Sequence, residues 1–381
     1  MGAAFLMATS AIGPGFITQT TKFTAELAAS FGFVILVSVA LDIGAQLNIW
    51  RIISVSKLYA PDLANTILQG AGLFLTILVV IGGIAFSIGN IAGCGLGMQV
   101  LFGWDVKTGA AISCVISVMI FSIREAGMAM DWFAKLLGFI MIGLTVFVAI
   151  QSHPPVGEAI FKSFVPDKID ETIILTIVGG TVGGYISFAG AHRLLDAGIS
   201  GEKNLRKVSV SSVTALMIAA IMRIVLFLAA LGIVSQGISL DPKNPAATVF
   251  QSAAGMVGYK LFGLVIWSAA ITSVVGSAFT SVSFMKTLSP FILKHLRYFI
   301  IGFIFFSTVI FLCVGEPVKV LIFAGGLNGL ILPVALSLIL TGAFKKSIIG
   351  NYRHPYWMQV AGWMVVIAMT YLGTKGIINL F

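Results

Sequence analysis

The chain has 381 residues, of which 58% are hydrophobic and 10% are charged, and its mean hydropathy is +1.05. Soluble domains carry roughly a quarter charged residues, so this composition excludes a water-soluble protein and indicates an all-α membrane protein. The formal net charge of +9 does not indicate nucleic-acid binding, because the basic residues lie in short segments between apolar runs. The cysteines Cys94, Cys114 and Cys313 lie inside such runs without metal-ligand spacing, and we interpret them as small core residues.

Runs of about 20 apolar residues predict membrane-spanning helices. By this measure we expect about eleven, at 2–26, 29–53, 70–100, 107–123, 131–152, 172–199, 208–236, 258–284, 298–314, 317–342 and 357–380. Because the connections are short, the chain is expected to form one transmembrane domain over 1–381. It opens in an apolar run without a basic leader, so the first span should remain in the mature protein. So abrupt a start also suggests that a short native leader is missing.

The distribution of lysine and arginine predicts the orientation of the chain. Loops after even-numbered spans hold roughly twice as many of these residues as loops after odd-numbered spans. The N-terminus is therefore expected in the cytoplasm and, because the number of spans is odd, the C-terminus outside. We expect a monomer in a bacterial-type plasma membrane. The expected partners of the protein are the lipid bilayer, a small-molecule substrate and a coupling proton or sodium ion. No cofactor and no nucleic acid is expected.

Two of the predicted spans are interrupted in their middle. The first contains Gly13-Pro14-Gly15-Phe16, where the proline removes a backbone donor and the glycines permit angles that a helix does not hold. The sixth contains four glycines between Gly179 and Gly184. Non-helical backbone at membrane depth is tolerated only where it is buried in protein or lines a watery cavity. Both breaks are therefore candidate parts of a binding site, although close helix packing or a simple kink is the alternative.

The positions of the two breaks matter more than either break alone. The first and sixth spans each open a set of five, which predicts two inverted five-helix repeats at about 2–152 and 172–342, followed by an extra helix at 357–380. Paired interrupted spans in corresponding halves are a sequence signal for the substrate site of a secondary transporter.

These features resemble the Nramp family of secondary transporters over essentially the whole chain, including Phe31-Gly32-Phe33 at the start of the second span. The resemblance implies a LeuT-type fold with broken helices 1 and 6. Metal-transporting members of the family carry Asp-Pro-Gly-Asn in the first break and Ala-Thr-Val-Met-Pro-His in the sixth span. This chain has Gly13-Pro14-Gly15-Phe16 and Gly180-Thr181-Val182-Gly183-Gly184-Tyr185 there. It keeps the hinge but lacks the Asp, Asn and Met ligands and the following His.

Without those ligands, the two breaks offer backbone groups, hydroxyls and aromatic rings. Half-helix N-termini carry partial positive charge and unpaired N–H donors, which suit a carboxylate better than a bare cation. We therefore expect no metal site, no catalytic residue and no enzyme activity. The residues expected to bind substrate are Gly13, Pro14, Gly15, Phe16, Gln19, Asn90, Gly180, Thr181, Gly183, Gly184, Tyr185 and Phe188.

The branch of the family that this sequence resembles most shares the opening Met-Ala-Thr-Ser-Ala-Ile-Gly-Pro-Gly-Phe (7–16) and is often encoded near 5-oxoprolinase genes in bacteria. The resemblance implies import of 5-oxoproline or a related small organic acid, by alternating access and coupled to protons or another ion. The alternative is a divalent metal transporter with an altered site. A channel would need a continuous ring of like groups, and an intramembrane enzyme a catalytic pair at matched depth; neither pattern is visible.

Ionisable residues at membrane depth are expected to couple or gate transport. Asp42, in the second span, is a candidate proton carrier or a structural hydrogen-bonded carboxylate. Lys22 and Glu26, four residues apart in the outer half of the first span, form a candidate outer gate. His192 and Arg193 lie in the inner half of the sixth span.

His192 is a candidate proton group, two residues beyond the corresponding family histidine. Arg193 is interpreted as an interfacial anchor. Glu125 is expected to frame a cytoplasmic gate at the end of the fourth span. Arg223, deep in the seventh span, needs a partner, and a structural ion pair is favoured over contact with the substrate. The hydroxyls of the eighth span are expected to line the pathway or a sodium site, or to bind backbone of their own helix; they are Thr272, Ser273, Ser277 and Thr280.

Overall fold

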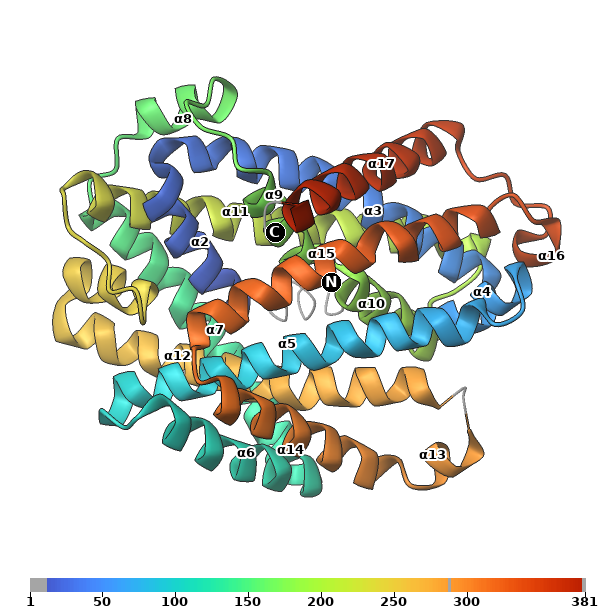
Figure 1. The fold of residues 1–381 in the computed structure, drawn as a ribbon, viewed down its shortest axis with the longest axis horizontal. Helices are drawn as coiled ribbons and strands as arrows, with labels where there is room; N and C mark the ends of the chain where they lie inside the picture. The colour runs from blue at the N-terminus through green and yellow to red at the C-terminus, as the bar shows by residue number, and fades with distance from the viewer. Residues whose placement is uncertain (1–11, 287–288, 379–381) are drawn as a thin grey trace.

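The computed structural model describes residues 12–286 and 289–378, apart from the side chains of 124–131 and 134–135. Regular structure in these residues is entirely helical (Figure 1), as the composition predicted. The helices, in chain order, are α2 (Pro14–Leu27), η1 (Ala28–Ser30), α3 (Phe31–Ser56), α4 (Ala60–Ile67), α5 (Ala71–Phe102), α6 (Val106–Ser122), α7 (Arg124–Gln151), α8 (Val156–Phe164), α9 (Glu171–Val182), α10 (Gly184–Asp196), η2 (Glu202–Asn204), α11 (Leu205–Ser235), α12 (Pro245–Met285), α13 (Pro290–Lys294), α14 (Leu296–Val314), α15 (Pro317–Gly342), α16 (Lys346–Ile349) and α17 (Tyr356–Ile378).

Each expected span corresponds to one of these helices or to a pair of them. By length and apolar composition, eight stretches of the described chain are long enough to cross a membrane, and one of them, Pro14–Ser56, contains both α2 and α3. Figure 1 shows the chain turning sharply between these two helices. The apolar helix α6 is shorter, and the second half of α7 forms with α8 a pair bent by 102°.

Two helices begin earlier than the apolar runs predicted. α7 begins at Arg124 instead of residue 131, and α12 begins at Pro245 instead of residue 258. Pro245 occupies the first turn of α12, where its missing N–H is not needed, and the side chain of Asn244 accepts a hydrogen bond from the Ala247 N–H at 3.3 Å. The added turns of α12 lead to Gly255, whose φ of 60° interrupts the helix. For α12, hydropathy missed these turns because a cap and a proline mark the start of the helix.

α5 runs through the middle of the bundle, with α15 on one side and α6 and α14 on the other, while α12 packs along its length (Figure 1). Glycines permit this close packing. Gly97 faces the backbone of Trp267 in α12, and an added Cβ there would lie within 3 Å of it. The sequence of α5 therefore determines how closely its neighbours approach.

The prediction for the cysteines is correct for two of them. Cys94 and Cys114 are buried in the core, whereas Cys313 is exposed on α14. Phe305 and Phe306 of the same helix are also exposed. In a membrane protein an apolar run alone does not distinguish the lipid-facing side of a helix from its buried side, because both are apolar.

We expect Gly179→Ala to lower the free energy of unfolding by about 1–3 kcal/mol. An added Cβ would collide with the Gly325 carbonyl oxygen and the Gly329 backbone of α15, and backbone cannot move aside as a flexible side chain can. The thermal unfolding midpoint of the protein in detergent measures the effect. Gly302→Ala, inside α14 with open space around it, is the matched control. Equal midpoints for the two variants would show that α9 and α15 do not pack this closely.

His354 joins the α3 and α17 regions at one end of the bundle. It is buried in the segment before α17, and its Nε2 donates to the Asn48 Oδ1 at 2.7 Å. The orientation of the Asn48 amide is fixed because its Nδ2 donates to the carbonyls of Gly44 and Met358. Burial, together with the positive charge of Arg51, lowers the pKa of His354 from 6.5 to about 4.

Because the folded pKa of His354 lies below the unfolded value, its contribution to stability is complete above pH 6.5 and is lost as the pH falls towards about 4. We expect His354→Gln, which retains a donor for Asn48, to lose less stability than the wild type over this pH interval. Unfolding midpoints measured across this pH interval test the expectation. The control is His295→Gln, at a half-exposed histidine. Parallel curves for the wild type and His354→Gln would show that His354 does not titrate in this way.

Candidate functional site

The first break lies where α2 begins. Gly13 is buried with an extended backbone (φ −99°, ψ −174°), and its carbonyl oxygen accepts a hydrogen bond from the Ile17 N–H at 3.2 Å. Pro14 occupies the first turn of α2, and its ring packs on Gly93 of α5, where any side chain would collide with it. The part of the first predicted span that precedes the break lies outside the described residues, which begin at residue 12.

The second break is present but shorter than the sequence predicted. α9 ends at Val182, α10 begins at Gly184, and between them only Gly183 has an extended backbone (φ −47°, ψ 158°). The Ser187 hydroxyl donates to the Val182 carbonyl at 2.7 Å, which satisfies a group that the break deprives of its helical partner. A single residue is therefore enough to separate the two half-helices.

Glycines of α9 and α15 allow the side chain of Gln19 in α2 to pack closely against both helices. An added Cβ at Gly180 would lie 2.7 Å from Gln19 Oε1, and one at Gly325 would lie 2.6 Å from Gln19 Nε2. The Nε2 group donates to the Leu321 carbonyl of α15 at 2.8 Å, while the buried Oε1 has no hydrogen-bond partner. Gln19 thus lies between α9 and α15 with one acceptor atom free.

Asn328 of α15 holds the second break in place. It is fully buried, and its Nδ2 donates to the carbonyls of Gly82 in α5 and Ala324 in its own helix, at 3.1 and 3.0 Å. Its Oδ1 accepts a long hydrogen bond of 3.4 Å from the Tyr185 N–H in the first turn of α10. Asn328 was not among the predicted site residues; its sequence signal is a single amide in the middle of the largely apolar span 317–342.

One face of α5 connects the two breaks. Phe86, Asn90 and Gly93 are spaced four and three residues apart and so share this face. The Phe86 ring lies 5.6 Å from the Tyr185 ring of α10, between centroids, while Gly93 contacts Pro14 of α2. Asn90 lies between these contacts; it is buried, and its Nδ2 has no hydrogen-bond partner. The structure therefore brings Asn90 close to both breaks, which its place in the sequence could not establish.

Three other residues expected to bind substrate have structural partners. Thr181 Oγ1 donates to the Ile177 carbonyl of its own helix at 2.8 Å. Phe188 is fully buried and packs on Phe284 of α12, with ring centroids 6.3 Å apart. The missing side chain of Gly184 would point at Ile331 of α15. A large residue at 184 would therefore displace α15, so loss of transport in such a variant would not by itself identify a binding site.

The expected gating residues lie at opposite ends of the bundle. Lys22 and Glu26 form a partly exposed ion pair near the end of α2. His192 of α10 accepts a hydrogen bond from the Ala60 N–H at 3.0 Å, just beyond the other end of α3. The length of α3, roughly 39 Å at 1.5 Å per residue, separates the two places. α2 and α10 extend from the breaks in these opposite directions (Figure 1).

Ring contacts and hydrogen bonds around His192 hold the end of α10 against its neighbours. Its ring stacks on Phe284 with centroids 4.4 Å apart and meets Tyr59 edge-on at 4.9 Å. The Tyr59 hydroxyl donates to Asp196, and this hydrogen bond is the main reason that the pKa of Tyr59 is raised to about 12. Arg193 is exposed, as expected for an interfacial anchor. The Glu125 side chain lies outside the described residues.

Asp42 and Arg223 are both buried, 2% and 3% exposed. The guanidinium carbon of Arg223 lies 4.3 Å from the centroid of the Phe16 ring, in the first turn of α2. Each of the two charges acts on the other through space. However, none of the ion pairs among the described residues joins them. The direct ion pair expected for Arg223 is therefore not among those of the described residues; Asp42 is an opposite charge near Arg223, and the guanidinium lies over an aromatic ring.

Three of the four hydroxyls considered in the eighth predicted span, those of Thr272, Ser277 and Thr280, bind backbone of their own helix, the second of the two roles considered for them. Thr272 donates to Ser268 and Ala269 carbonyls, and Ser277 and Thr280 donate to carbonyls three and four residues earlier. Among the described residues, no group of three or more His, Cys, Asp or Glu side chains could hold a metal ion. The donors at the breaks are instead amides, backbone groups and a guanidinium.

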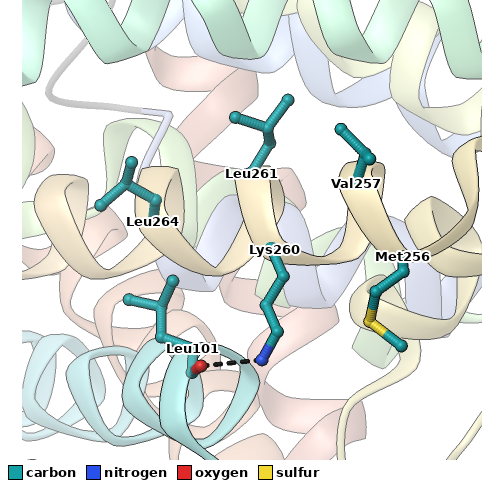
Figure 2. A pocket seen from close by; sticks show the side chains of 6 residues that line it. All are labelled: Leu101, Met256, Val257, Lys260, Leu261 and Leu264. Atoms are coloured by element: carbon teal, nitrogen blue, oxygen red, sulfur yellow. Dashed lines mark hydrogen bonds between the residues drawn. The ribbon is translucent and has the colours of Figure 1, made fainter.

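A separate pocket of about 400 Å³ lies at the far end of α5 (Figure 2). Leu, Met and Val side chains line it, and Lys260 of α12 donates from its edge to the Val100 and Leu101 carbonyls at 2.7 Å. Leu101 follows Asn90 by three helical turns, or roughly 16 Å. The pocket is therefore remote from the helix breaks.

The described helices, with α2 starting after Gly13, one span broken at Gly183 and one face of α5 between these two points, have the arrangement of a membrane transporter of the LeuT type. The family model for natural resistance-associated macrophage protein-like (Nramp) proteins matches residues 4–379. The chain therefore belongs to the Nramp family of transporters.

Two relatives are similar over nearly their whole length. The Bacillus subtilis membrane protein YcsG is 60% identical over 373 residues, which cover 98% of this chain and 92% of the relative. A Haemophilus influenzae membrane protein is 58% identical over 379 residues, covering 100% and 96%. Both are described only as uncharacterized membrane proteins, so these relatives do not identify a substrate.

Solved structures show the same fold at low sequence identity. A manganese transporter from Eremococcus coleocola matches with a TM-score of 0.71 and 14% identity, covering 98% of this chain and 85% of that one. The protein MhsT, in complex with L-phenylalanine, matches with a TM-score of 0.67 and 16% identity, covering 100% of this chain and 98% of that one. The nucleobase-cation-symport-1 family transporter with bromovinylhydantoin bound matches at 0.59 and 15%, covering 100% and 92%.

We expect Asn328→Ala to lower the free energy of unfolding by about 1–3 kcal/mol, because it leaves the buried Gly82 carbonyl and Tyr185 N–H without their side-chain partner. The thermal unfolding midpoint in detergent measures the change. Asn351→Ala, at an exposed turn, is the matched control and should match the wild type. If both variants unfold at the wild-type midpoint, Asn328 does not hold the break.

Proposed function

We propose that this protein is a secondary active transporter that imports a small organic acid or amino-acid-like solute by alternating access around the breaks at Gly13 and Gly183. The observation that carries the proposal is that the first turns of α2 and α10 contact the same face of α5, Pro14 at Gly93 and Tyr185 at Phe86. The first N–H groups of a helix have no partner within it and carry partial positive charge, so both termini favour an anion.

The unpartnered side-chain atoms at the breaks indicate what else the solute carries. Gln19 Oε1 is a buried free acceptor, and Asn90 Nδ2 is a buried free donor. A cyclic amide supplies the complementary N–H and C=O groups, and the rings of Phe16 and Tyr185 supply apolar walls. 5-Oxoproline combines such an amide with a carboxylate on a five-membered ring. It is therefore the best candidate substrate.

Structural relatives support an organic solute in this fold. One neighbour holds L-phenylalanine and another holds bromovinylhydantoin, whose hydantoin ring is also a five-membered cyclic amide. The rival substrate is a divalent cation, which the manganese transporter neighbour favours. Against it, the breaks lack the carboxylates, imidazoles and thioethers that bind such ions in proteins.

The gating and coupling roles follow from position. We place the N-terminus in the cytoplasm, so that the contacts of His192 with Ala60 close the cytoplasmic side and the pair of Lys22 and Glu26 lies on the outer side. Asp42, whose buried Oδ1 has no hydrogen-bond partner, is the proposed proton carrier. A protonated Asp42 would leave Arg223 as the dominant charge near the first break and so favour an entering anion.

Binding by the purified protein tests the proposal. We expect L-5-oxoproline to raise the thermal unfolding midpoint in a concentration-dependent way, because a ligand that binds only the folded state stabilises it by mass action. Mn²⁺ and Mg²⁺ should leave the midpoint unchanged. Stabilisation by the metals and by none of a panel of small carboxylic acids would instead establish a metal transporter.

A further inference from the structure

Arg223 has an unusual environment for a buried charge. It is 3% exposed in the middle of α11, and its guanidinium lies over the Phe16 ring, in the first turn after the break. A cation over an aromatic face gains some electrostatic stabilisation, but this does not replace the hydrogen bonds that the guanidinium loses on leaving water. A structural role for Arg223 would require further partners.

Two nitrogen atoms of Arg223 have no such hydrogen-bond partner. Nε and Nη2 of Arg223 are buried without a hydrogen-bond partner, and the nearby Asp42 Oδ1 is likewise unpartnered. Nε–H and the adjacent N–H of Nη2 lie on the same edge of the planar guanidinium and point in parallel. This edge is the fork that accepts both oxygens of one carboxylate, and it is the geometry for which arginine is preferred to lysine.

We propose that Arg223 is the residue that selects for a carboxylate: its Nε and Nη2 bind the two carboxylate oxygens of the transported solute beside Phe16. This inference rests on the proposed function and adds its specificity determinant. The Arg223 fork supplies a full charge at the place where the N-termini of α2 and α10 supply partial ones. The same fixed positive charge repels a divalent cation at this position.

Binding measurements on the purified full-length chain test the inference, with L-5-oxoproline and pyrrolidin-2-one, the same ring without the carboxylate, as probes. We expect Arg223→Gln to weaken binding of L-5-oxoproline about a hundredfold or more. Arg223→Lys keeps the charge but loses the fork, so it should weaken binding about tenfold. Binding of pyrrolidin-2-one should change little in either variant. Arg206→Gln, exposed on the same helix, should bind both probes as the wild type does.

The outcomes separate this inference from the proposed function. If wild-type protein binds L-5-oxoproline and Arg223→Gln binds it within threefold, the assignment of Arg223 is wrong and the proposed function stands. If the wild type binds neither L-5-oxoproline nor any other carboxylic acid in the panel, the proposed function is wrong and this inference with it. The unfolding midpoint of the unliganded variants is the second readout. A large fall for Arg223→Gln, but not for Arg206→Gln, would assign the guanidinium a structural role and overturn the inference.

Discussion

The constraint on which this structure depends is that backbone groups at membrane depth need partners. A break in a spanning helix removes several helical hydrogen bonds where no water replaces them, so the surrounding protein must supply others. At Gly183 the Ser187 hydroxyl donates to the Val182 carbonyl, and the Asn328 side chain of α15 accepts a hydrogen bond from the Tyr185 N–H in the first turn of α10. At Gly13 the ring of Pro14, which has no N–H to satisfy, packs against Gly93.

Under the proposed function, these contacts also determine where the solute binds. The same contacts that stabilise the breaks place α2 and α10 against one face of α5, with Asn90 between them. Polar atoms that remain without partners there, on Gln19, Asn90 and Arg223, are costly in an apolar interior unless a ligand completes them. Their chemistry is that of amide and carboxylate recognition. A shared fold with a manganese transporter is compatible with this, because function depends on the residues at the site.

Some errors of sequence interpretation share one cause. Apolar periodicity describes what a segment is made of, and it does not say which neighbour it meets. Gly179 and Gly180 were assigned to the second break, yet they lie inside α9. There, Gly179 leaves room for the backbone of α15, and Gly180 leaves room for the Gln19 side chain. Arg223 was expected to have an ion-pair partner because a charge at that depth needs compensation. Its actual neighbour, Phe16, lies more than 200 residues away in the sequence and could not be identified without the fold.

The sequence by itself determined the membrane class, the positions of the spans and the pairing of two broken helices. These follow from composition and from glycine and proline, whose effects on the backbone are local. Through its resemblance to the Nramp family, it also predicts that the ligands of the metal-transporting members are missing at 13–16 and 180–185. Only the tertiary structure decided which face of α5 joins the breaks, that Asn328 supports one of them, and that Arg223 lies over Phe16. Those facts depend on how distant helices pack, and packing is a property of the whole bundle that no single segment encodes.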